Sequence, residues 1–95
     1  MELLWTPEAI EDRKYIYDYI EADNPFAALA LDDRIAEKIG ALGEYPKMGR
    51  PGKVLNTFEL VIHSSYMVIY DVMETRVRIL NVVHTARQWP PLRDE

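Results

Sequence analysis

The chain has 95 residues, of which 48% are hydrophobic and 28% charged, and its formal net charge is −5. This profile is typical of a single globular domain, residues 1–95, and the acidic balance excludes a protein that binds phosphate backbones over a broad surface. There is no cysteine for disulfides, and no stretch approaches the roughly 20 apolar residues of a membrane span, so we expect a cytoplasmic protein with no membrane partner.

The first predicted elements are a short strand at residues 2–5 and a long helix. Thr6-Pro7 has the residue types preferred at a helix start, with threonine as the N-cap and proline as the first helical residue. We expect this helix to run to about residue 22. Its apolar stripe comprises Ala9, Ile16, Tyr19 and Ile20. Tyr15 and Tyr17 lie off the stripe, where either packing at its rim or contact with a partner would explain them.

A second helix is predicted from Asn24-Pro25, which repeats the start signal. Apolar residues then recur every three or four positions, at Ala28, Leu31, Ile35, Ile39 and Leu42. The helix should end near Gly43, because Tyr45-Pro46 prevents its continuation. A short link between two long amphipathic helices predicts an antiparallel helical hairpin, and we expect Ile35 and Ile39 to face the sheet.

Residues 46–53, PKMGRPGK, form a predicted loop that is dense in proline and glycine. The loop carries three positive charges, on Lys47, Arg50 and Lys53, and no acidic residue. Two interpretations stay open. The cations either contact an acidic partner surface or are simply solvated, while the glycines and prolines shape the turn.

After this loop the hydrophobic pattern changes to a period of two, which predicts strands. The predicted strands are residues 58–63, 66–72 and 77–84. Ser64-Ser65 and Glu74-Thr75 suit hairpin turns between them. In the third strand we expect Val77, Ile79 and Val83 to share one face.

The predicted order of elements is therefore β-α-α-β-β-β, an α+β fold. The strands should form a small antiparallel sheet by a meander, with the helical hairpin packed on one face. The other face should be free, or partly free, to meet a partner.

Six strings are spread over nearly the whole chain. They are WTPEAIEDRKYIYDYI (5–20), NPFAA (24–28), P-x-x-G-R-P-G (46–52), T-x-E-L-V-I (57–62), Y-x-V-I-Y (66–70) and I-L-x-V-x-H-x-A-R-x-W-P (79–90). With these strings the chain resembles the RelE/ParE superfamily of plasmid-stabilisation toxins. The resemblance implies the toxin of a type II toxin–antitoxin pair, neutralised by a cognate antitoxin whose extended or helical segment wraps it. Contact with DNA is implied only indirectly, through the antitoxin complex.

Two branches of the superfamily differ in what they attack: RelE-like members cut mRNA in the ribosome, and ParE-like members poison DNA gyrase. The nuclease branch commonly has an arginine where this chain has Met67. The GRPG loop and the H-x-A-R-x-W-P end resemble the ParE-like branch, which implies DNA gyrase as the target and inhibition by binding. Phe58, Asp71 and Asn81 stand where that branch frequently has arginines, so a decayed toxin that only binds its antitoxin stays open.

The residues that we predict to bind the target are Arg87, Trp89, Lys47, Arg50 and Lys53. Arg87 and Trp89 follow the last strand and are of the types enriched at binding hot spots. The alternative is that Trp89 packs on the sheet edge while Arg87 is solvated.

The enzymatic alternative is a metal-independent endoribonuclease, in which His84 would be the base, Arg87 the phosphate clamp and Tyr66 the orienting group. No catalytic residue is favoured, and both histidines equally suit ordinary strand ends. We expect no cofactor and no metal, because His63 and His84 lack zinc-site spacing. His63-Ser64-Ser65 suits a hairpin turn rather than a serine hydrolase, because no strand–turn–helix elbow surrounds it.

Overall fold

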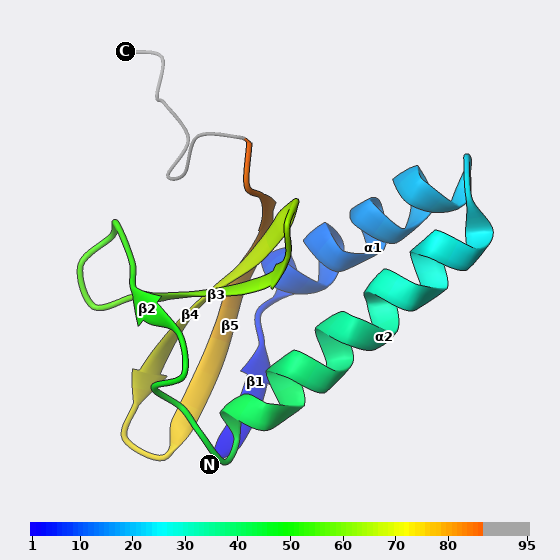
Figure 1. The fold of residues 1–95 in the computed structure, drawn as a ribbon. Helices are drawn as coiled ribbons and strands as arrows, with labels where there is room; N and C mark the ends of the chain where they lie inside the picture. The colour runs from blue at the N-terminus through cyan, green and yellow to red at the C-terminus, as the bar shows by residue number, and fades with distance from the viewer. Residues whose placement is uncertain (87–95) are drawn as a thin grey trace.

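The computed structural model describes residues 1–86, which fold into a five-stranded sheet with a helical hairpin on one face (Figure 1). In chain order the elements are β1 (Glu2–Trp5), α1 (Pro7–Glu21), α2 (Pro25–Leu42), β2 (Arg50–Pro51), β3 (Phe58–His63), β4 (Tyr66–Met73) and β5 (Arg76–His84). The predicted α+β fold is confirmed, as are both helices. Within residues 1–86, neither helix is long and apolar enough to cross a membrane.

Both helices begin where their capping residues predict. The Thr6 hydroxyl accepts a hydrogen bond from the Ala9 backbone N–H at 3.2 Å, and the Asn24 side-chain oxygen accepts one from Ala27 N–H at 3.1 Å. Each cap satisfies a backbone donor that the helix itself leaves without a partner, and a proline occupies the next position in both helices. α2 ends at Leu42, with Gly43 as its C-cap.

The sheet has the strand order β1-β5-β4-β3-β2. The meander of β3, β4 and β5 is antiparallel, as predicted. β1 adds a parallel edge to it, from Glu2 opposite Arg76 to Trp5 opposite Ile79, so the complete sheet is mixed. At the other edge, two residues of the predicted loop pair with β3 as the short strand β2.

The strand alternation expected in β5 is interrupted by a bulge. Ile69 pairs with Asn81 and Tyr70 with Ile79, which leaves Leu80 as an extra residue in β5. An extra residue reverses which face the following side chains point to. The prediction that Val83 shares the face of Ile79 is therefore wrong, and it is Val82 that is buried in the core.

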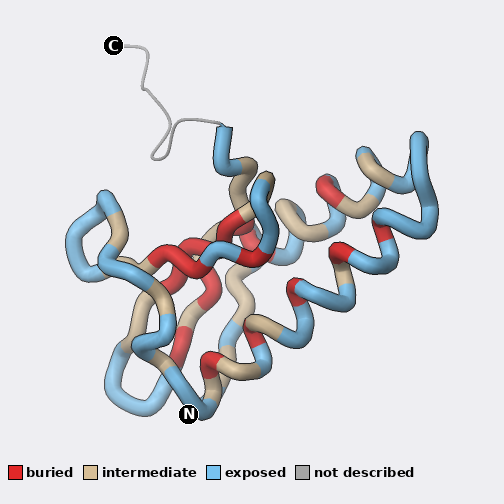
Figure 2. Tube along the Cα trace, in the orientation of Figure 1, coloured by how far each residue is buried: buried red, intermediate tan, exposed pale blue. Residues whose placement is uncertain are grey.

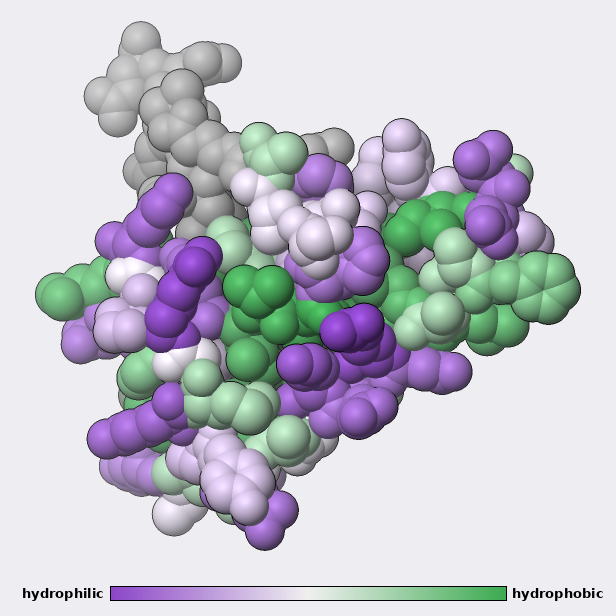
Figure 3. Space-filling view, viewed as in Figure 1, coloured by the Kyte–Doolittle hydropathy of each residue, from purple (hydrophilic) through white to green (hydrophobic). Residues whose placement is uncertain are grey.

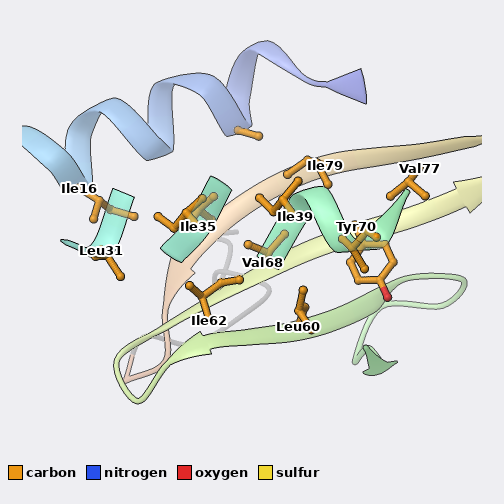
Figure 4. Packing of buried hydrophobic residues seen from close by; sticks show 13 residues of the cluster. Ile16, Leu31, Ile35, Ile39, Leu60, Ile62, Val68, Tyr70, Val77 and Ile79 are labelled. Carbon is orange, nitrogen blue, oxygen red and sulfur yellow. The ribbon is translucent and has the colours of Figure 1, made fainter. Parts of the chain in front are cut away.

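The core lies between the sheet and the two helices (Figures 2 and 4). Buried positions recur along α2 at helical spacing in Figure 2. Ile35 and Ile39 of α2 point toward Val68 and Ile79 of the central strands, which confirms the expected direction of that helix (Figure 4). Figure 3 shows hydrophobic residues reaching the surface in the seam between the sheet and α2.

The assignment of Tyr19 to the core was wrong, because this side chain is 70% exposed. The hairpin projects beyond the sheet at its connecting turn (Figure 1), so residues near the end of α1 have no strand beneath them. Tyr19 stacks instead on Tyr15, with ring centroids 6.4 Å apart. Tyr15 is exposed, and Tyr17 is partly buried.

The sheet face opposite the helices is only partly free. Met67 and Ile69, whose side chains alternate with the core residue Val68, are both buried. Val61 pairs with Met67 in the neighbouring strand and is 44% exposed. Exposed apolar surface on this face is therefore confined to its margin.

Candidate functional site

The three predicted cations of the basic loop lie together next to the outer edge of the sheet. Arg50 begins β2, and Lys47 and Lys53 lie on either side of that strand with exposed side chains. The Arg50 side chain is 63% exposed although its Nε donates to the Glu59 carboxylate. Neither Lys47 nor Lys53 forms an ion pair within residues 1–86. The loop therefore presents positive charge to solvent.

Glu59 holds this loop, although it was not among the predicted site residues. Its side chain is only 4% exposed, and it is the second residue of β3. One carboxylate oxygen accepts from Arg50 Nε and the other from the Lys53 backbone N–H, both at 3.1 Å. A buried carboxylate requires such partners. The signal in the sequence was an acid within the apolar string F-E-L-V-I, close after a basic loop.

Tyr70 fixes the start of the same loop. Its hydroxyl accepts a hydrogen bond from the Gly49 backbone N–H at 2.9 Å, and burial raises the pKa of Tyr70. The approach is close enough that a Cβ at position 49 would lie 2.8 Å from both the Tyr70 hydroxyl and the Glu59 carbonyl oxygen. Only glycine fits there without displacing the backbone, which explains the first residue of GRPG.

A second candidate site lies where α1 passes the ends of β4 and β5. His84 and Tyr66 meet edge to face, with ring centroids 5.1 Å apart. They line an open cleft of about 380 Å³, together with Tyr15, Ile16, Tyr19 and Ala86. The structure thus brings together two members of the nuclease alternative. The third member, Arg87, lies outside the described residues, as does Trp89.

Both histidines use Nδ1 as an acceptor of local backbone hydrogen bonds. His84 Nδ1 accepts from Ala86 N–H at 3.0 Å, and His63 Nδ1 accepts from Ser65 N–H at 3.2 Å. A neutral imidazole that accepts at Nδ1 carries its proton on Nε2, so Nε2 is a donor rather than a base. Residues 1–86 contain no cluster of three potential metal ligands.

Several other arginines of the sheet and α1 are paired with carboxylates. Arg78 makes two hydrogen bonds to Asp71, at 2.9 and 2.6 Å, which raise the pKa of Arg78. Arg76 pairs with Glu2 at 3.2 Å, and Arg13 pairs with Asp32 at 2.7 Å. The positive charges of these three guanidinium groups are thus partly offset by their carboxylate partners.

The sequence of this chain is similar to those of known bacterial toxins. A family model described as the ParE toxin of the type II toxin–antitoxin system parDE matches residues 3–89. The chain is 41% identical over 86 residues to Y4kP of Sinorhizobium fredii, named as a candidate toxin, with 90% of both chains covered. It is 34% identical to toxin RelE2 of Caulobacter vibrioides, with coverage of 90% of this chain and 97% of that one.

Two solved structures share the fold. A chain of the chromosomal ParDE toxin–antitoxin system from P. aeruginosa superposes with a TM-score of 0.78 and 26% identity, covering 88% of this chain and 95% of that one. The YoeB/ParE toxin from Agrobacterium tumefaciens superposes with a TM-score of 0.63 and 16% identity, covering 88% and 98%.

Proposed function

Because this chain belongs to the ParE toxin family of type II toxin–antitoxin systems, we propose that it inhibits DNA gyrase by binding the enzyme and that a cognate antitoxin neutralises it. Inhibition of gyrase is what the resemblance to the ParE-like branch implies. An antitoxin partner agrees with the toxin–antitoxin complexes among the structures that share this fold.

The observation that carries the proposal is that, among residues 1–86, no lysine or arginine lines the cleft of His84 and Tyr66. Metal-free RNA cleavage builds negative charge on the phosphorane, which needs fixed cations nearby. Met67, at the position where the nuclease branch commonly has an arginine, is 5% exposed and apolar. Binding to a protein surface requires none of this chemistry.

The ribonuclease alternative has one observation in its favour, which is the contact between His84 and Tyr66. The hydrogen bond from Ala86 N–H to His84 Nδ1 argues against the ribonuclease alternative. With Nδ1 accepting this bond, a neutral His84 carries its proton on Nε2, so Nε2 is not free to act as a general base. The alternative therefore requires His84 to release this bond.

The test is induction in bacteria, together with assays of purified gyrase. We expect the wild-type protein to inhibit supercoiling, to trap cleaved DNA and to induce a DNA damage response while ribosome-bound mRNA stays whole. Arg87→Ala combined with Trp89→Ala should abolish inhibition and keep antitoxin binding. A matched control combines Arg34→Ala with Phe26→Ala, an arginine and an aromatic residue that are both exposed on α2. Codon-specific cuts in mRNA at the ribosomal A site, without DNA breaks, would overturn the proposal in favour of the enzyme.

A further inference from the structure

The loop of residues 52–57 projects from the sheet between β2 and β3 (Figure 1). It carries an unusually exposed leucine. Leu55 is 86% exposed and its neighbour Val54 is 38% exposed. A folded chain gains nothing by presenting a large aliphatic side chain to water at the tip of a loop. The loop therefore has a feature that its own fold does not explain.

The backbone of this loop is held in one conformation by several hydrogen bonds. Gly52 N–H donates to the Thr57 carbonyl at 2.8 Å, and Thr57 donates to the Val54 carbonyl through both its N–H, at 3.2 Å, and its hydroxyl, at 2.6 Å. Asn56 has a φ of 65°, the positive value that the third residue of a type II turn requires. Leu55 is thereby placed at the corner of the turn.

Residues 50–53, where the loop leaves β2, are also held in place by hydrogen bonds and close packing. Glu59, buried in β3, accepts from the Lys53 N–H and from Arg50. Gly52 lies so close to Thr57 that a Cβ there would come within 2.4 Å of the threonine hydroxyl. A loop that is ordered before binding loses little conformational entropy when it binds. The 52–57 loop is thus a rigid support for Leu55.

The charge around Leu55 indicates what kind of surface it meets. Lys47, Arg50 and Lys53 lie in or beside the loop, and residues 45–58 contain no acid, although the whole chain has a net charge of −5. Electrostatic complementarity therefore requires a negatively charged rim around the pocket that receives the leucine. The same charges would repel a basic surface.

We infer that the 52–57 loop inserts Leu55 into an apolar, acid-rimmed pocket on the protein that this toxin inhibits. The inference rests on the proposed function, since it takes the toxin to act by binding a protein, with gyrase as that protein. It adds the hydrophobic anchor to the basic loop and assigns Glu59 the role of a positioning residue. Leu55 supplies buried apolar area, and the lysines and Arg50 steer the approach.

The test compares Leu55→Ser with a matched control, Leu29→Ser, which alters a leucine 52% exposed on α2. Each purified variant is assayed for inhibition of gyrase supercoiling, for antitoxin binding and by thermal melting, and is induced in bacteria. We expect Leu55→Ser to need at least about tenfold more protein for half-inhibition, the factor expected when one buried aliphatic contact is lost. Leu29→Ser should inhibit within about twofold of wild type, and both variants should melt and bind antitoxin as wild type does.

The charged rim is tested with Lys53→Glu, which keeps the backbone bond to Glu59 and reverses only the side-chain charge. Inhibition should weaken by more at low than at high ionic strength. Leu55→Ser acting like wild type on gyrase would overturn the inference and leave the proposed function intact. Leu55→Ser losing antitoxin binding while staying toxic would also overturn it. If the wild-type protein fails to inhibit gyrase, the proposed target is wrong. Growth arrest then tests the inference: loss of arrest in Leu55→Ser supports it, and unchanged arrest overturns it.

Discussion

Two polar side chains inside the sheet determine how the basic loop is shaped, although neither belongs to the loop. Tyr70 accepts from the Gly49 N–H, and Glu59 binds Arg50 and the Lys53 N–H. Each satisfies a backbone donor that would otherwise need water. A change at either position should therefore act on the loop through its conformation, with the surface charge of the lysines unaltered.

Stability should fall in alkaline solution because of Tyr70. Burial raises the pKa of this hydroxyl above 10.0, the value of an exposed tyrosine, so the unfolded state releases the proton first. The contribution of Tyr70 to the free energy of unfolding is then constant below about pH 10 and declines as the pH rises further. Tyr70→Phe should remove this part of the decline and should cost about 1 kcal/mol at neutral pH through the lost bond to Gly49.

Urea denaturation at several pH values between about 9 and 11 measures the effect of Tyr70. Tyr45→Phe is the control, since Tyr45 is 60% exposed. This variant should keep the alkaline decline of the wild-type protein. An equally steep decline in Tyr70→Phe would show that other groups cause it.

At the scale of elements, the helix bounds were predictable and the bulge in β5 was not. Thr6-Pro7 and Asn24-Pro25 act on residues three or four positions away, so their effect can be read from the sequence. The bulge after Ile79 is bridged by Asp12 of α1, whose carboxylate accepts from the Asn81 side chain and from Val82 N–H, both at 3.0 Å. That contact spans 70 positions in the sequence, and no local pattern reveals it.

Ile39→Ala should lower the free energy of unfolding by about 2–4 kcal/mol, the usual range when a large side chain is removed from a core. Ile39 is 2% exposed between α2 and the central strands. Ile10→Ala is the matched control, because Ile10 is 53% exposed on α1 and should cost much less. Denaturant melts of the two variants give the comparison. Similar losses in both would contradict the packing described for α2.

At the scale of the whole molecule, the fold class could be predicted from the sequence, whereas much of the candidate target-binding site could not. The β-α-α-β-β-β order follows from periodicity, which depends on which residues are apolar. The importance of Glu59 and Leu55 depends on where the chain places them. Alternation in β3 separates Glu59 from the core residues Leu60 and Ile62, but it does not show that Arg50 and the Lys53 N–H bind the Glu59 carboxylate there. Arg87 and Trp89, predicted to bind the target, lie outside the described residues.

Growth arrest tests whether the molecule is an active toxin. Induced alone, the protein should stop bacterial growth, and co-expression of a cognate antitoxin should restore growth, as membership of the family implies. Viable counts after induction give the result, with immunoblots to confirm equal amounts of soluble protein. Normal growth at high levels of soluble protein would favour a decayed toxin that only binds its antitoxin.

The parallel pairing of β1 with β5 has a consequence for the timing of synthesis. β1 is translated before β5, yet it pairs in the sheet only with residues 76–79 of that strand. The Thr6 N–H and hydroxyl, which join α1 to that strand, likewise wait for the Ile79 carbonyl. Contacts so distant in sequence form late in folding. A chain released before β5 has been made therefore lacks the strand with which β1 pairs, and its sheet stays incomplete.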